Sequence, residues 1–152
     1  SGLLIGQTLA TRPEQVYRAL IEATAFGARA IVERLSESGV TINEIVACGG
    51  VAEKSPLLLQ IYADVLGLPI RLPRTEQACA LGAAVFGSVV GGGHKDVASA
   101  VGAMTGFKDK SFVPIEENSR RYDRIYSIYK RLYDTFGSSS LMKELIAIRE
   151  EA

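Results

Sequence analysis

With 152 residues, 47% of them hydrophobic and 22% charged, the sequence is typical of one folded domain and excludes an intrinsically disordered chain. Its 17 basic residues balance its 17 acidic residues, so the charge gives no support for a nucleic-acid or membrane partner. The two cysteines, Cys48 and Cys79, and the one histidine exclude a disulfide framework and argue against a zinc site. Free thiols are typical of cytoplasmic proteins. We expect both cysteines to be small residues of the core.

The first predicted element is a long helix that begins at Pro13 and ends at Gly39. Its N-terminal cap is expected at Thr11 or Arg12, and apolar residues recur along it at spacings of three and four. Within this helix, Glu22 fits either a buried, hydrogen-bonded carboxylate or a solvated surface position. The pattern alone leaves both open.

A short apolar run at 45–48 predicts a strand buried on both faces, which Gly49 and Gly50 end. Ser55 then caps a helix predicted at 56–66. The remaining expected elements are a strand at 68–72, a helix at 77–90 capped by Thr75, a short helix at 97–104, a polar loop that carries Phe112 and Pro114, and a tyrosine-striped helix at 122–136.

The uncharged run from Gln77 to His94 could suggest a membrane span. Its apolar part, 78–90, is too short to cross a bilayer and consists largely of Ala and Gly. We therefore expect a buried helix there.

The alternation of helices and strands predicts an α/β fold with two adjacent parallel strands, flanking helices and a helical C-terminal tail. Two strands rarely form a stable sheet, so we expect further strands upstream in a longer protein. Where those strands are absent we expect an exposed apolar sheet edge, which a neighbouring molecule could cover, and a homodimer is one such arrangement.

The strand that ends in Gly49-Gly50 and is followed by a capped helix could hold a phosphate. Glycine lets a ligand approach the main chain, and a helix N-terminus favours an anion. A plain strand-to-helix turn remains the alternative. In the same way, the Ala- and Gly-rich stretch 77–87 could admit a flat ligand or serve only for tight helix–sheet packing.

Taken together, these two stretches resemble the FGGY carbohydrate kinases, whose domains have the actin-like ATPase (ribonuclease H-like) fold. The segments that carry the resemblance are LIEATAFGAR (20–29), ACGGVAEKSP (47–56), SPLLLQIYADVLGLPI (55–70) and EQACALGAA (76–84), and within the family they are most similar to bacterial ribulokinases. The resemblance implies that 1–110 is the C-terminal part of the nucleotide-binding domain and 111–152 a helical extension packed on it.

The resemblance also implies an ATP- and Mg²⁺-dependent kinase that converts L-ribulose to L-ribulose 5-phosphate, with a xylulokinase-like or other FGGY sugar kinase as the alternative. By this resemblance, Gly49 and Gly50 line the α-phosphate and ribose, and Lys54 lies beside the adenine or ribose. Three further residues, Gln77, Leu81 and Gly82, support the adenosine pocket. The catalytic Asp and the sugar site are expected upstream, so this chain alone is predicted to be inactive.

Two other classes of protein remain as rivals. A Rossmann-type dinucleotide binder would need a Gly-x-Gly-x-x-Gly turn and an acidic ribose ligand, whereas the second predicted strand carries Arg71 and is followed by Arg74. A non-catalytic interaction module could be built on the helical tail.

Overall fold

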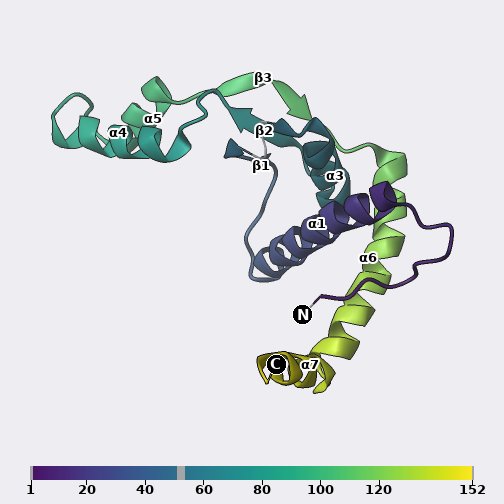
Figure 1. The fold of residues 1–152 in the computed structure, drawn as a ribbon. Coiled ribbons are helices and arrows are strands. Elements are labelled where there is room, and N and C mark those ends of the chain that lie inside the picture. Colours follow the sequence, from purple (N-terminus) through teal and green to yellow (C-terminus); the bar gives the residue numbers. More distant parts are fainter. Residues whose placement is uncertain (1, 51–53, 152) are drawn as a thin grey trace.

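The computed structural model describes residues 2–50 and 54–151. Figure 1 shows its elements in chain order: α1 (Pro13–Glu37), β1 (Ile45–Val46), α3 (Pro56–Leu66), β2 (Ile70–Pro73), α4 (Ala78–Val90), α5 (Val97–Met104), β3 (Phe107–Phe112), α6 (Glu116–Gly137) and α7 (Leu141–Glu150).

The three strands form one sheet in the order β1-β2-β3. The strands β1 and β2 are parallel, with Ile45 opposite Ile70, which confirms the predicted parallel pair. The loop predicted around Phe112 was wrong, because β3 pairs antiparallel with β2 and Phe112 lies opposite Ile70. The charged residues between the two phenylalanines of β3 are typical of a loop, which is why the sequence alone predicts one. They fit an edge strand, where polar side chains can face solvent.

Helix α3 lies between the sheet and the pair α1 and α6, and it is the most buried helix of the described chain. Toward the sheet, Leu59 and Ala63 pack with Ile70, Leu72 and Phe112. Toward the two other helices, a second cluster joins α1, α3 and α6 and consists of Ala25, Phe26, Ile61, Val65, Tyr122 and Tyr126. The two clusters together form the core.

The helix boundaries follow local signals in the sequence. Arg12 is the N-cap of α1, with Pro13 in its first turn, as expected. Ser55 caps α3, because its Oγ accepts a hydrogen bond from the Leu58 amide at 3.3 Å. At the other end of α3, Gly67 adopts a left-handed conformation with φ of 65° that ends the helix.

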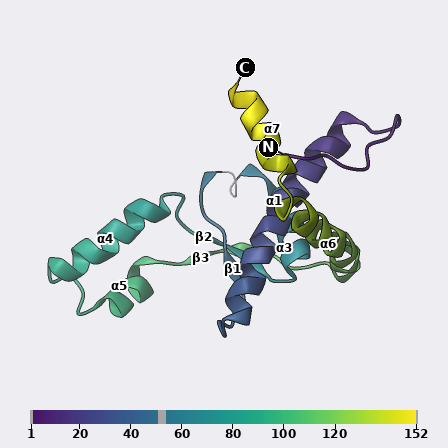
Figure 2. The same cartoon turned by 90° about the horizontal axis from the view of Figure 1, so that it is seen from below.

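The helices α4 and α5 pack on each other and project away from the rest of the molecule in both views (Figures 1 and 2). The prediction of a buried helix at 77–90 was therefore wrong, since Val85 is the one buried residue of α4. Cys79 in its first turn is exposed, and so is Cys48, which follows the short edge strand β1. Val46 is 45% exposed, so β1 is not buried on both faces.

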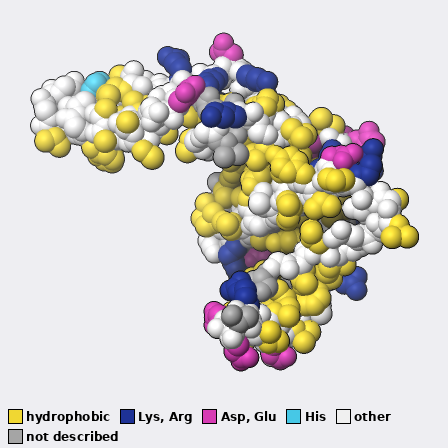
Figure 3. All heavy atoms as spheres, viewed as in Figure 1, with side chains coloured by type: hydrophobic (Ala, Val, Ile, Leu, Met, Phe, Trp, Pro, Cys, Tyr) yellow, Lys and Arg dark blue, Asp and Glu magenta, His cyan; other side chains and the backbone are white. Residues whose placement is uncertain are grey.

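Hydrophobic side chains gather along the lower edge of this arm and over the middle of the molecule (Figure 3). On the arm, Phe86 is 62% exposed and Val90 is 89% exposed. Such surfaces commonly contact another part of a protein or a partner. No helix within 2–50 and 54–151 combines the length and the apolar character needed to cross a membrane.

The start of α6 is tied to α3 by one buried carboxylate. Asp64 is 3% exposed and accepts hydrogen bonds, each of 2.8 Å, from the Ile115 amide, the Asn118 side chain and the Gln60 side chain. A buried carboxylate needs such partners to offset its loss of hydration. This cluster fixes where the C-terminal helices leave the sheet.

Candidate functional site: the diglycine and the β1–α4 hollow

The predicted diglycine lies just beyond the end of β1 and has an open main chain. Gly49 has φ of +100°, a conformation that strains any residue with a Cβ, whereas Gly50 is not among the glycines with positive φ. Both glycines are exposed, and a Cβ at either position would meet no atom within 4 Å. Nothing among the described residues therefore blocks a ligand from approaching this stretch of backbone.

The rest of the motif leads into α3. Its residues 51–53 lie outside the described residues, and Lys54 is exposed. At the start of the helix, Ser55 satisfies the Leu58 amide by capping it. The strand, the two glycines and the capped helix thus follow one another as the sequence predicted.

Beside β1, a hollow of about 300 Å³ opens between the sheet, α4 and α5, and we call it the β1–α4 hollow. Its lining residues are Val46, Pro73, Thr75, Ala78, Leu81, Gly82, Val85, Phe86, Val97, Val101, Thr105, Gly106 and Phe107. Its volume is at the lower end of the range of roughly 300–1,000 Å³ that is common for small-molecule pockets. The lining side chains are apolar except for the two threonines.

Both threonine hydroxyls of the hollow are engaged in local structure. Thr75 Oγ1 accepts a hydrogen bond from the Gln77 amide at 3.1 Å. Thr105 Oγ1 donates to the Val101 carbonyl at 2.8 Å. The hollow therefore offers shape and apolar contact rather than free polar side chains.

The structure brings some of the predicted site residues together and leaves others outside the hollow. Leu81 and Gly82 of α4 line it, and a Cβ at Gly82 would meet no atom within 4 Å. Gln77 is the exposed N-cap of α4, although Thr75 had been predicted as the cap. The diglycine and Lys54 do not line the hollow.

Sequence reasoning missed the wall that β3 contributes to the hollow. Phe107 lines it, and the Arg71 guanidinium lies over the Phe107 ring, 3.7 Å from the ring centre. Arg71 in turn pairs with Glu44 at 3.3 Å. The one signal in the sequence was the spacing of the two phenylalanines around a polar stretch, and it is too weak to distinguish a strand from a loop.

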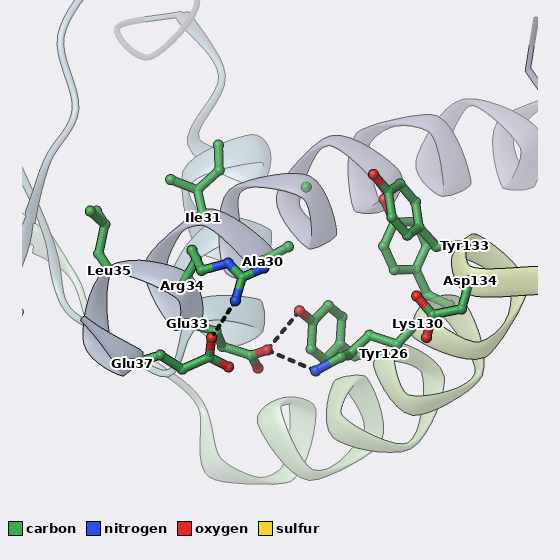
Figure 4. A pocket seen from close by; sticks show the side chains of 12 residues that line it. Ala30, Ile31, Glu33, Arg34, Leu35, Glu37, Tyr126, Lys130, Tyr133 and Asp134 are labelled. Atoms are coloured by element: carbon green, nitrogen blue, oxygen red, sulfur yellow. Dashed lines mark hydrogen bonds and ion pairs between the residues drawn. The ribbon is translucent and has the colours of Figure 1, made fainter. Parts of the chain in front are cut away.

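A second and larger depression, the α1–α6 groove, has a volume of about 590 Å³ (Figure 4). Its polar centre is Glu33, which accepts hydrogen bonds from Tyr126 at 2.9 Å and from Lys130 and Arg29. Burial opposes ionisation of Glu33, but these three donors outweigh it and lower its pKa. Burial and the bond to Glu33 raise the pKa of Tyr126 to about 12.

These side chains already form hydrogen bonds with one another. We therefore interpret the groove as a contact that holds α6 against α1. A second such contact lies nearer the start of α1. There Glu22 accepts from the Tyr122 hydroxyl and from Arg18, both at 2.8 Å, and its side chain is 18% exposed. Of the two alternatives for Glu22, the hydrogen-bonded carboxylate is the one observed. The hydrogen bond to Glu22 raises the pKa of Arg18, and burial raises that of Tyr122.

Within the described part of the chain, no three His, Cys, Asp or Glu side chains gather so that they could hold a metal ion. At Gly49, Gly50 and Gly82, a Cβ would meet no atom within 4 Å, so the described residues leave the backbone open to a ligand there. The described residues thus leave these glycines accessible and do not by themselves form a metal site.

Comparison with known proteins identifies the class to which this fold and its diglycine belong. Residues 1–90 match the model of the C-terminal domain of the FGGY family of carbohydrate kinases. The chain therefore belongs to the FGGY family of carbohydrate kinases, as its motifs predicted.

Among individual relatives, a ribulokinase of Bacillus licheniformis is 47% identical over 150 residues, and one of Mycolicibacterium smegmatis is 47% identical over 153 residues. The alignments cover 95% and 100% of this chain, yet only 27% of each relative. The chain thus spans about a quarter of the length of the relatives it matches.

Solved structures agree on the fold. A xylulose kinase from Rhodospirillum rubrum superposes with a TM-score of 0.77 at 28% identity, over 90% of this chain and 28% of that one. A ligand-bound xylulose kinase from Lactobacillus acidophilus gives a TM-score of 0.79 at 23% identity, over 89% of this chain and 27% of that one. The chain has the corresponding part of the actin-like ATPase fold.

Proposed function

We propose that this chain is the nucleotide-binding portion of a longer, ATP-dependent kinase that phosphorylates a ketopentose, converting L-ribulose to L-ribulose 5-phosphate. The observation that carries the proposal is the 47% identity to two ribulokinases over essentially the whole chain. Xylulokinase activity is the alternative, because two of the solved relatives are xylulose kinases. Such a kinase would draw its ATP from the cytoplasm, and a homodimer is compatible with the exposed edge at β1.

In this proposal, Gly49 and Gly50 let the main chain approach the α-phosphate and ribose, and Lys54 lies beside the nucleoside. The support is the open, exposed backbone at both glycines. Leu81 and Gly82 lie behind the adenosine pocket in supporting roles, and both line the β1–α4 hollow. Gln77, at the N-cap of α4, has the same supporting role from outside the hollow.

ATP bound here supplies the phosphoryl group, and Mg²⁺ would be held by groups outside the described residues. The catalytic carboxylate and the sugar site belong to the remaining part of the kinase. Phosphoryl transfer depends on positioning both substrates and neutralising the phosphate charge, so one wall of the site is insufficient for it.

We also propose that residues 1–110 are the C-terminal part of the nucleotide-binding domain and that 111–152 form a helical extension packed on it. The Asp64 cluster and the Glu33 contact support this, since both join the extension to α1 or α3. The boundary falls inside β3, whose six residues straddle it.

The test is a coupled assay of ADP release by the full-length protein with L-ribulose, D-ribulose and D-xylulose. We expect the highest kcat/KM for L-ribulose. A clear preference for D-xylulose would establish the alternative, and turnover with none of the three sugars would refute the proposed substrate class.

A further inference from the structure

We propose that Asp64 is a positioning residue for the nucleotide: through it the C-terminal extension holds α3, and α3 in turn holds the diglycine backbone where ATP binds. The inference rests on the proposed nucleotide-binding function. It gives residues 111–152 a role in a site that the sequence motifs place on β1 and the start of α3. Asp64 acts through α3 and is not expected to touch the nucleotide.

The diglycine is supported by α3 on both of its sides. Before it, Ile45 and Ala47 of the β1 segment pack against the core cluster that contains Leu59 of α3. After it, the motif enters α3 at the Ser55 cap. The position of α3 therefore affects the chain on both sides of the two glycines.

Near the other end of α3, Asp64 joins this helix to the start of α6. Its Oδ1 accepts hydrogen bonds from the Ile115 amide and the Gln60 side chain, each at 2.8 Å. Its Oδ2 accepts from the Asn118 side chain, also at 2.8 Å. The Gln60 side chain donates in addition to the Val113 carbonyl at 2.9 Å. Two residues one helical turn apart on α3 thus contact the chain that connects β3 to α6.

The burial of Asp64 makes this contact more specific than the apolar packing around it. The carboxylate is 3% exposed, so a displaced donor would lose its partner without gaining water. The other packing of α3 against α6 joins Ile61 and Val65 to Tyr122 and Tyr126. Apolar contacts tolerate small shifts, whereas a buried polar network specifies one arrangement. We therefore assign to Asp64 the position of α3 relative to the extension.

The hydrogen bonds of Asp64 allow a reciprocal test. In Asp64→Asn, the amide oxygen can keep two donors only if the new NH2 group faces the NH2 group of Asn118. Turning the amide over would place its NH2 group against the other two donors. The variant should therefore shift α3 relative to α6. The double variant Asp64→Asn/Asn118→Asp exchanges the donor and the acceptor, so it should restore the contact and the position of α3.

The experiment measures the calorimetric dissociation constant of ATP and the KM for L-ribulose in the full-length protein, at a temperature where every variant is folded. Asp64→Asn should weaken ATP binding by roughly three- to thirtyfold and leave the sugar KM unchanged. The double variant should return the ATP constant to within about twofold of the wild type. The matched control is Tyr126→Phe, which removes the hydrogen bond between the extension and Glu33 of α1. It should lower the melting temperature without changing the ATP constant.

The outcomes separate this inference from the proposed function. A folded Asp64→Asn protein with wild-type ATP affinity would overturn the role of Asp64 and leave the kinase proposal standing. Weakened binding that the double variant does not restore would also overturn it, because the effect would not come from the contact with Asn118. Absence of ATP binding by the folded wild type would overturn the kinase proposal itself. Should Asp64→Asn fail to fold, Asn118→Ala decides, since it removes one donor at a half-buried position and should also weaken ATP binding.

Discussion

Replacing Asp64 by alanine should detach the start of α6 from α3. The carboxylate is 3% exposed and accepts three hydrogen bonds, of which two come from the segment that begins α6, at Ile115 and Asn118. The third donor, Gln60, also bonds to the Val113 carbonyl at 2.9 Å and so keeps a partner. The Ile115 amide and the Asn118 side chain would thus lose their acceptor, at a cost of roughly 1–3 kcal/mol each, or roughly 2–6 kcal/mol in total.

The matched control is Asp123→Ala. Asp123 also joins α6 to a neighbouring helix, through a 2.7 Å ion pair with Arg29, but its side chain is 59% exposed. Exposed pairs contribute about 0–1 kcal/mol. Hydrogen exchange of the full-length protein would show faster exchange in the first turns of α6 for Asp64→Ala and little change for the control. Equal protection in both variants would refute the argument that the buried carboxylate anchors the extension.

Three further predictions follow from individual groups. Gly49→Ala should destabilise the protein by about 1 kcal/mol in urea unfolding because of its positive φ, whereas Gly50→Ala should cost less than half of that. The raised pKa of Tyr126, about 12, means that its neutral form is favoured in the folded state. The resulting stabilisation is complete below the ordinary tyrosine pKa of about 10 and is lost as the pH rises toward 12, which an absorbance titration compared with Tyr126→Phe would detect. The chain alone should show no sugar-dependent ADP release, and turnover above the blank would disprove the division of the site between two parts of the protein.

Much of the framework followed from local sequence signals. The parallel pair β1 and β2 was predictable because two apolar runs flank a capped helix, and Ser55 and Gly67 marked the ends of α3. The family was predictable from the diglycine and the Ala-Gly helix together. These features depend on neighbouring residues, so a single sequence contains them.

The errors concern features set by distant residues. Strand β3 exists because β2 offers it a partner, and its polar residues 108–111 look like a loop in isolation. Cys48, Cys79 and most of α4 are exposed. Composition does not reveal this, because exposure depends on which other elements pack against β1, α4 and α5. The Phe107 wall was missed for the same reason, since it depends on an irregular register and on Arg71 from another strand.

The most direct test of the nucleotide-binding role is the ATP dissociation constant of full-length Gly50→Val. Because Gly50 has no positive φ and a Cβ there would meet no atom within 4 Å, the variant should fold normally. Its branched side chain would occupy the space assigned to the nucleotide, and each ~1.4 kcal/mol of lost binding weakens affinity tenfold. We predict a loss of at least a hundredfold, with unchanged affinity in the exposed control Cys48→Ala. A folded Gly50→Val protein that binds ATP as tightly as the wild type would show that the diglycine is only a turn.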